Sequence, residues 1–507
     1  MRDFNGCAHT TMSSDTIYKE VVVVGNGPSG LGLSYMLAGN WPYYNNVAHP
    51  DEMLTARLHS SRHTRSLIHQ DLKFLSQGLE GRSNNPVSVL MDCLTHPGAD
   101  AGLDTPQLLK WRPHADKAVD HIVLGKGPPG GAWQAMDGNV LTISLNSWME
   151  LPGLEFRRWE ARNGSPVTST RRVPVASVAA YYRDYVKLMR LSKYFRSGVV
   201  VTSVRPIGGL ASHPGEKIDS EADTATCHCH CHCHLSARWA VEGYDTVTNT
   251  PFLYVCRSVV LATGSTDLHN FLNVPGELSH PSWVFHDLAD FEKALTELVK
   301  ETPGIKEGYR TVDPVCIVGA GLSAADAVLS SRFHSLPIIH IFRRAEVSPE
   351  RTLPENMYPE YHKVHQMMRS GGEGYPEYSA FPQHKVVDIS AGDGKKVTTV
   401  SPSGLQVVHQ VSLMAVLIGS RPDLSFLPPE FQDGQALAVD PEKTLDCRSN
   451  PISVDPWSHS VNGAPVGLYA MGPLGGDNFV RFLLGGALAI ASDIYSERKE
   501  LSPPHCV

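Results

Sequence analysis

The residues best suited to chemistry in this chain form two glycine-rich turns. The first is Gly25-Asn26-Gly27-Pro28-Ser29-Gly30, a G-x-G-x-x-G pattern, and the second is Gly319-Ala320-Gly321-Leu322-Ser323-Ala324, a G-x-G-x-x-A pattern. In such a turn the first glycine permits a tight bend, the second lets a pyrophosphate approach the backbone, and the third position lets helix and strand pack closely. A following helix offers unpaired N–H groups and a positive dipole end to the phosphates. Two complete patterns predict two dinucleotide sites.

The flanking sequence supplies the strand and the helix that each pattern requires. Val21–Val24 is a run of β-branched residues typical of a buried strand, and residues 31–38 follow as a helix. Residues 315–318 and 325–331 repeat that order around the second turn. The sequence therefore predicts an α/β fold with two dinucleotide-binding, Rossmann-like domains. The candidate phosphate-binding residues are Gly25, Gly27, Pro28, Ser29 and Gly30 in the first turn, and Gly319, Gly321, Ser323 and Ala324 in the second.

Three more segments place candidate ligand contacts after a predicted strand. Residues 121–124 lead into a loop with Gly130, Gly131 and Trp133, which suits a flat aromatic ligand, although a glycine turn beside a core tryptophan is the alternative. Residues 141–146 read as a strand ending at Asn146, whose amide could bond a cofactor ring or simply form a turn. The strand over 259–264 ends at Gly264.

The residue after the second strand of a dinucleotide-binding unit commonly contacts the ribose. In the first unit we expect that strand near residues 45–48, where Asp51 and Glu52 are the nearest acids; a polar loop is the alternative. In the second unit the strand over 338–342 ends in Arg343 and Arg344, which suit a ribose 2′-phosphate. This favours NADPH over NADH, and a solvated strand end is the alternative.

The end of the chain offers one more set of candidate contacts. A predicted strand reaches Gly472, and Asp477 and Asn478 precede an apolar helix over 479–491. Asp477 could cap that helix, hold a cofactor hydroxyl, or do both. We include Gly472, Asp477 and Asn478 among the cofactor-binding residues.

Composition narrows the class of protein. The 507 residues are 42% hydrophobic, enough for two or three domains, and the net charge of -8 argues against nucleic-acid binding. The apolar runs are too short to span a bilayer, and residues 1–20 lack the apolar core of a secretory signal. Six of the ten cysteines are scattered, which indicates reduced intracellular thiols.

The other four cysteines alternate with histidines over Cys227–His234. Strict alternation differs from the ligand spacing of a zinc site, in which two to four residues separate a pair of cysteines. On an extended chain, neighbouring side chains also point to opposite faces, so they cannot converge on one metal ion without a bend. We interpret this tract as a low-complexity expansion within a surface insert over about 208–236, and expect no functional metal site. A disulfide reductase is disfavoured because no C-x-x-C or C-x₄-C pair follows the first glycine turn.

Taken in order, these motifs resemble those of the class B flavin monooxygenases: the first turn, the G-G-x-W loop at Gly130–Trp133, the strand end at Gly264, and the second turn. Longer stretches resemble the oxidative stress-induced growth inhibitor family, and these are DLKFLSQGLEGR at 71–82, LGKGPPGGAW at 124–133, WMELPGL at 148–154, YPEYHKVHQMM at 358–368 and GDNFVRFL at 476–483.

That resemblance implies FAD at the first turn and NADPH at the second. It places Gly25, Gly27, Gly30 and Trp133 against FAD, Gly319, Gly321 and Arg343 against NADPH, and Asn146 near the flavin as the catalytic residue. It implies an NADPH-dependent monooxygenase that acts on a small-molecule or protein-side-chain nucleophile. A regulatory or scaffolding protein that keeps the fold with little turnover is the alternative, and regulatory protein partners would suit either.

The resemblance also implies roles in growth, cell death and cytokinesis under oxidative stress. We expect a cytoplasmic location, with the cytoskeleton, midbody or mitochondria as places of association. The predicted domains are a leader over 1–15, an FAD-binding domain over 16–290 and 445–507, and an NADPH-binding domain over 291–444.

Overall fold

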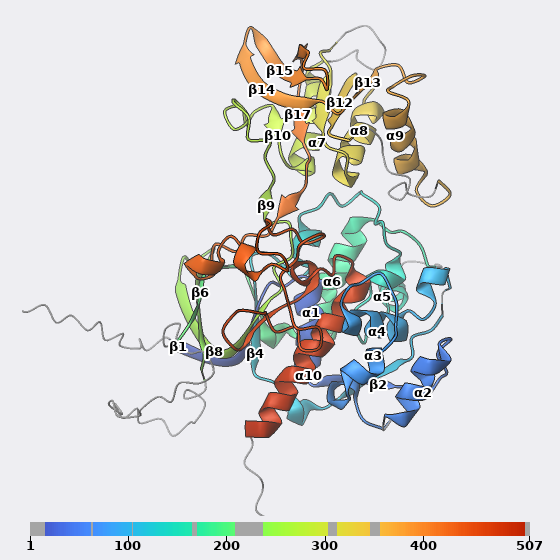
Figure 1. Ribbon diagram of the computed structural model, residues 1–507, viewed down its shortest axis with the longest axis vertical. Coiled ribbons are helices and arrows are strands. Elements are labelled where there is room, and N and C mark those ends of the chain that lie inside the picture. Colours follow the sequence, from blue (N-terminus) through green and yellow to red (C-terminus); the bar gives the residue numbers. More distant parts are fainter. Residues whose placement is uncertain are drawn as a thin grey trace, which may run out of the picture. The chain divides into compact units, whose positions relative to one another are not determined.

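The computed structural model describes residues 16–61, 64–103, 105–164, 170–207, 237–302, 312–344 and 355–501. The chain forms two compact units (Figure 1). Unit 1 comprises Met1–Ser265 and Pro422–Val507, and unit 2 comprises Thr266–Arg421. The predicted leader and the Cys227–His234 tract lie outside the described residues. In the described part of the chain, no helix combines the length and apolar character needed to cross a membrane.

Unit 1 is built on a mixed sheet with the order β5-β4-β1-β8-β7-β6, and β19 also pairs with β8. Strand β1 is parallel to both of its neighbours, β4 and β8, whereas β7 and β6 complete the sheet as antiparallel strands. The bounds are β1 (Thr16–Val24), β4 (His121–Gly125), β5 (Phe195–Ser197), β6 (Val199–Pro206), β7 (Trp239–Asp245), β8 (Pro251–Leu261) and β19 (Leu468–Ala470).

The valines of β1 are all buried because both faces of this strand are covered. Val21 and Val23 pack into a core with helices α1 (Pro28–Leu37) and α10 (Leu483–Leu501), while Val22 and Val24 pack into a second core on the other face. Because successive side chains of a strand point to opposite faces, a strand covered on both sides must be apolar at every position. The remaining helices of unit 1 are α2 (Glu52–Ser60), α3 (Leu72–Ser76), α4 (Pro86–Thr95), α5 (Phe156–Arg162) and α6 (Val175–Leu188).

The second parallel strand of unit 1 is not where the sequence placed it. Strand β2 (Asn40–Tyr44) pairs antiparallel with β3 (Leu109–Pro113) in a separate sheet, and β4 lies beside β1. The carboxylate of Asp51 accepts hydrogen bonds from the N–H groups of Met53 and Leu54, so this acid caps α2. The segment between α1 and β4 thus contains α2, α3 and α4. The expectation of a parallel strand near residues 45–48 that presents Asp51 or Glu52 to a ribose was wrong, because the strand there is β2, which is antiparallel to β3.

Two other expectations about local structure were wrong. Residues 141–146 do not form a strand, because only Leu141 makes an isolated bridge, to Pro174, and Asn146 begins a short 3-10 turn over Asn146–Met149. Helix α10 begins at Leu483, so Asp477 does not cap it. Instead, the side chains of Asn146 and Asp477 accept hydrogen bonds from segments distant in sequence, as described below.

Unit 2 contains a five-stranded parallel sheet with the order β10-β17-β11-β12-β13. Its strands are β10 (Val284–Phe285), β11 (Val315–Val318), β12 (Ile338–Phe342), β13 (Tyr378–Pro382) and β17 (Met414–Val416), with helices α7 (Leu288–Glu301), α8 (Leu322–Phe333) and α9 (Pro359–Arg369). An antiparallel sheet joins β14 (Lys385–Gly392), β15 (Gly394–Val400) and β16 (Gln406–Gln410), and β9 (Leu268–His269) pairs with β18 (Ser420–Arg421). The sequence had placed the boundaries of this unit at 290/291 and 444/445. The structure includes 266–290 because β10 belongs to its sheet, and it ends the unit at Arg421.

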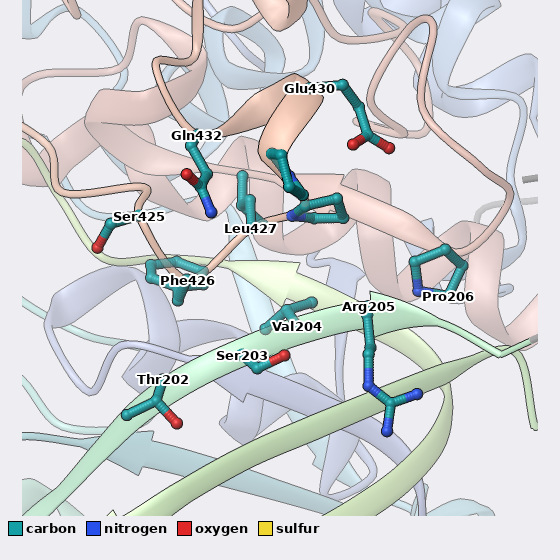
Figure 2. Close-up of a pocket in the computed structure, with 12 residues that line it drawn as sticks. Thr202, Ser203, Val204, Arg205, Pro206, Ser425, Phe426, Leu427, Glu430 and Gln432 are labelled. Carbon is teal, nitrogen blue, oxygen red and sulfur yellow. The ribbon is translucent and has the colours of Figure 1, made fainter. Parts of the chain in front are cut away.

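A hollow of about 390 Å³ lies in unit 1 between strand β6 and residues 425–432 (Figure 2). The carbonyl of Phe426 accepts a hydrogen bond from the N–H of Val204 at 2.7 Å, so the 425–432 segment partly covers this edge strand. Covering an edge strand limits its pairing with other chains. The lining residues include none of the candidate site residues, and we assign the hollow a structural role.

Candidate functional site

The first glycine turn can be formed only by glycine at two of its positions. Gly25 has φ +116°, and a methyl group there would lie 2.2 Å from the carbonyl oxygen of Ala262. A methyl group at Gly30 would lie 2.2 Å from the carbonyl oxygen of Gly25. These contacts are far below van der Waals separation and involve backbone atoms, so these two glycines shape the turn itself.

Gly27 is free of that constraint, and its neighbour is the second predicted loop. A methyl group at Gly27 would meet only the Cα of Gly131, at 3.9 Å, and the N–H of Gly130 donates to the carbonyl of Asn26 at 2.9 Å. The turn at 25–30 and the loop at 130–133 therefore lie together with bare backbone facing bare backbone. Such a side-chain-free surface suits a pyrophosphate, so the residues present fit the FAD that the sequence predicted.

The start of α1 and two strand ends complete this edge of unit 1. Gly27 precedes α1 without a side-chain cap, and Pro28 occupies the first turn, so the helix start is open to an anion. A methyl group at Gly472 would lie 2.4 Å from the Oγ of Ser29, so Gly472, which follows β19, lies against the first glycine turn. Gly264 follows the end of β8, where Leu261 is in register with Val24. The side chain of Trp133 has its ring centre 6.2 Å from that of Tyr182.

Asn146 is fixed by two hydrogen bonds to its Oδ1, while its side-chain NH₂ group is unpaired within the described residues. Its side chain is 1% exposed, and its Oδ1 accepts from the N–H groups of Ser147 at 2.9 Å and Arg171 at 3.0 Å. Within the described residues its Nδ2 is buried and has no hydrogen-bond partner. A buried donor without an acceptor is costly, which is the arrangement expected where a ligand supplies the acceptor.

Substituting Asn146 tests how much of this arrangement is structural. We expect Asn146→Ala to lower the free energy of unfolding by about 2 kcal/mol, because two backbone donors lose their acceptor at roughly 1 kcal/mol each. Urea unfolding of the FAD-free protein measures this. Asn146→Asp, which keeps an acceptor oxygen for both backbone N–H groups, is the matched variant. Equal stability of Asn146→Ala and the native chain would contradict the hydrogen-bond assignment.

Asp477 and Asn478 make internal contacts. The carboxylate of Asp477 is 1% exposed and accepts from Ser83 Oγ at 2.5 Å, Ser88 Oγ at 2.7 Å and Asn85 Nδ2 at 2.9 Å. Burial is the largest influence on the pKa of Asp477 and raises it. Asn478 is exposed and donates to the carbonyl of Cys447 at 2.8 Å. Asp477 thus ties the chain's closing segment to the start of α4, and the prediction that both residues contact a cofactor stays a prediction.

The second glycine turn repeats the geometry of the first within unit 2. Gly319 has φ +138°, and a methyl group there would lie 2.3 Å from the carbonyl oxygen of Leu417. Gly321 precedes α8 without a side-chain cap, and a methyl group there would meet no atom within 4 Å among the described residues. Ser323 is exposed and Ala324 is fully buried, its Cβ 3.3 Å from where a methyl group on Gly319 would lie. This turn is open to a pyrophosphate in the same way.

Arg343 and Arg344 lie at the same edge of the unit 2 sheet as this turn. Strands β11 and β12 are parallel, with Val318 in register with Ile341, so their carboxyl ends share one edge. Both arginines follow β12 directly and are exposed. This placement fits recognition of a phosphate on the ribose of a nucleotide bound at Gly319–Ala324.

His340 was not predicted from the sequence. It is fully buried in β12, its Nε2 lies 2.7 Å from the carbonyl oxygen of Gly319, and its Nδ1 lies 2.8 Å from the hydroxyl of Tyr378. A carbonyl only accepts, so Nε2 donates to Gly319, and in the neutral ring Nδ1 then accepts from the hydroxyl of Tyr378. Burial lowers the pKa of His340 to about 4. A histidine within an apolar strand carries no sequence signal for this role.

The neutral state of His340 predicts a loss of stability in acid. The unfolded chain binds the proton near the ordinary value of 6.5 and the folded chain only near 4, so this contribution is present above about pH 6.5 and is lost as the pH falls towards 4. We expect the β11 and β12 amides to lose about 2 kcal/mol of protection from hydrogen exchange between pH 7 and pH 5. His340→Gln should reduce that loss, and an unchanged pH dependence would contradict the assignment.

No protein-family model matches the chain. The chain is 40% identical over 493 residues to oxidative stress-induced growth inhibitor 2 of Homo sapiens, covering 95% of this chain and 94% of that protein. It is 40% identical over 494 residues to oxidative stress-induced growth inhibitor 1 of Mus musculus, covering 95% and 96%. A Caenorhabditis elegans homologue, osgn-1, is 29% identical over 503 residues.

Two solved structures share the fold at low identity. The bacillithiol disulfide reductase Bdr (YpdA) of Bacillus cereus matches with a TM-score of 0.56 and 16% identity, covering 95% of this chain and 99% of that chain. The ornithine hydroxylase PvdA of Pseudomonas aeruginosa matches with a TM-score of 0.54 and 14% identity, covering 95% and 100%. The predicted α/β fold with two Rossmann-like units, each with a glycine turn between a buried strand and a helix, is confirmed.

Proposed function

The chain belongs to the oxidative stress-induced growth inhibitor family, and we propose that it is an FAD- and NADPH-dependent flavoprotein monooxygenase. The observation that carries the proposal is the meeting of two loops in unit 1. The N–H of Gly130 donates to the carbonyl of Asn26 at 2.9 Å, and Gly27 and Gly131 face each other without side chains. A second open glycine turn in unit 2 supports a second nucleotide.

The residues of each unit have separate tasks in this proposal. In unit 1, Gly27, Gly131 and the start of α1 would hold the FAD pyrophosphate, and the buried Nδ2 of Asn146 would donate to the flavin side of the site. In unit 2, Gly321 and Arg343 would hold NADPH. When bound, FAD would supply the redox chemistry that links NADPH to O₂. The chain's own residues bind, orient and shield the two nucleotides from water.

The proposed substrate is a soft nucleophile such as a thiol, thioether or amine, on a small molecule or a protein side chain. The names of the relatives suggest a part in restraining growth under oxidative stress, and we include cell death and cytokinesis in this proposed role. Cytoplasmic location, with the cytoskeleton, midbody or mitochondria as places of association, belongs to the same proposal.

The absorbance spectrum of the purified protein tests whether it binds FAD and whether NADPH reduces the bound flavin. We expect a flavin spectrum that bleaches on anaerobic addition of NADPH and returns on exposure to air. NADH at the same concentration is the control for the nucleotide. A protein that cannot be reconstituted with FAD would contradict the proposal and leave the alternative, a regulatory or scaffolding protein that keeps the fold with little turnover.

A further inference from the structure

The end of β4 is where the first nucleotide site would ordinarily contact the adenosine ribose. Strand β4 is the parallel neighbour of β1, with Leu124 in register with Val24, so it takes the part of the second strand. A carboxylate commonly follows that strand and accepts a hydrogen bond from a ribose hydroxyl. Here the strand ends at Gly125 and continues with the exposed Lys126. Neither has a side-chain acceptor, since glycine has no side chain and an ammonium group only donates.

The space above Gly125 is filled by an amide from the first glycine turn. A methyl group at Gly125 would lie 2.1 Å from both Cγ and Nδ2 of Asn26 and 2.5 Å from its Oδ1. The side chain of Asn26 therefore occupies the volume where a side chain at position 125 would begin. Asn26 is 4% exposed, so this amide is part of the packed site.

Hydrogen bonds fix which way that amide points. Asn26 Nδ2 donates to the carbonyl of Gly127 at 2.7 Å and lies 3.4 Å from Ser197 Oγ. Because a carbonyl only accepts, the nitrogen must face Gly127, and Oδ1 must face away from it. No donor to Oδ1 is found within the described residues, which leaves one well-placed acceptor beside the glycine turn.

We infer that Asn26 replaces the missing carboxylate: its Oδ1 accepts a hydrogen bond from a 2′- or 3′-hydroxyl of the adenosine ribose at the first site. This rests on the proposed binding of FAD there. The inference makes Asn26 a specificity-determining residue that also shapes the turn through Gly127. Because the acceptor is neutral, this site recognises the ribose without the negative charge that a carboxylate would bring next to the pyrophosphate.

Affinity measurements with FAD analogues test this inference. We expect the native chain to bind FAD about fivefold more tightly than one of its 2′- or 3′-deoxyadenosine analogues, the effect of one neutral hydrogen bond. Asn26→Ala should bind FAD about fivefold more weakly and should no longer distinguish FAD from that analogue. Quenching of flavin fluorescence gives each Kd. FMN, which lacks the adenosine half, should bind the native chain and the variant equally.

Controls separate this inference from a general effect on the turn. Ser197→Ala removes only the longer contact of Asn26 and should keep the discrimination between FAD and its analogue. Equal weakening of FMN and FAD by Asn26→Ala would show that the amide only shapes the loop, and would overturn the inference. Discrimination that persists in Asn26→Ala but disappears in Lys126→Ala would overturn it as well. A native chain that binds neither FAD nor FMN would overturn both this inference and the proposed function.

Discussion

Gly27→Ala should abolish tight FAD binding while the protein remains folded. The backbone at Gly27 has φ -72°, which alanine adopts without strain, and the new methyl group would meet only the Cα of Gly131, at 3.9 Å. The same methyl group would stand where the pyrophosphate must approach the backbone. Hydrogen bonds to a charged group contribute about 1.5–3 kcal/mol each, so displacing the phosphates by one methyl should weaken FAD binding at least about a hundredfold.

Thermal unfolding of the FAD-free protein and titration with FAD together measure this prediction. Gly25→Ala is the matched variant, because the same added methyl group would lie 2.2 Å from the carbonyl oxygen of Ala262 and φ is +116°. We expect that variant to be unstable even without FAD. If Gly27→Ala bound FAD normally, the pyrophosphate would not lie over this turn, and the assignment of the first site would fail.

The parts of the fold that could be predicted from sequence are those that depend only on residues close together in the chain. The glycine turns were found because the requirements for a bend, a close approach and a helix start fall within six residues, and Val21–Val24 marks its strand by composition alone. The loop at 130–133 was recognised in the same way. The contact of that loop with the first turn includes a hydrogen bond between residues 26 and 130, and no pattern in the sequence indicates it.

The parts that could not be predicted depend on distant contacts. The long segment between α1 and β4 separates the two parallel strands in sequence, so spacing alone indicates Asp51, an acid that caps α2 instead. Asp477 looked like a helix cap because an apolar helix follows it, whereas its partners Ser83, Asn85 and Ser88 are almost 400 residues away. The role of His340 could not be predicted for the same reason, since it depends on Gly319, which directly follows β11, and on Tyr378 in β13.

Replacing Arg343 and Arg344 together by alanine should change which nucleotide the protein oxidises. Both side chains are exposed at the carboxyl end of β12, one strand from the second glycine turn, so their removal should not disturb the packed sheet. If they bind a 2′-phosphate, two charge-assisted contacts of about 1.5–3 kcal/mol each are lost with NADPH and none with NADH. The Kd for NADPH should rise at least about a hundredfold, while that for NADH should change little.

Anaerobic reduction of the FAD-loaded variant by each nucleotide measures this directly, because reduction bleaches the flavin band and the concentration dependence of its rate reports nucleotide binding. Arg332→Ala, on the same unit, is the control for the loss of a positive charge, although it removes one charge where the double variant removes two; that arginine lies over the ring of Tyr375 and in α8. Equal losses for NADPH and NADH would mean that the two arginines act through the general electrostatic potential of this edge. An unchanged preference for NADPH would show that Arg343 and Arg344 do not bind the 2′-phosphate. FAD binding in unit 1, which involves neither residue, should stay as in the native chain.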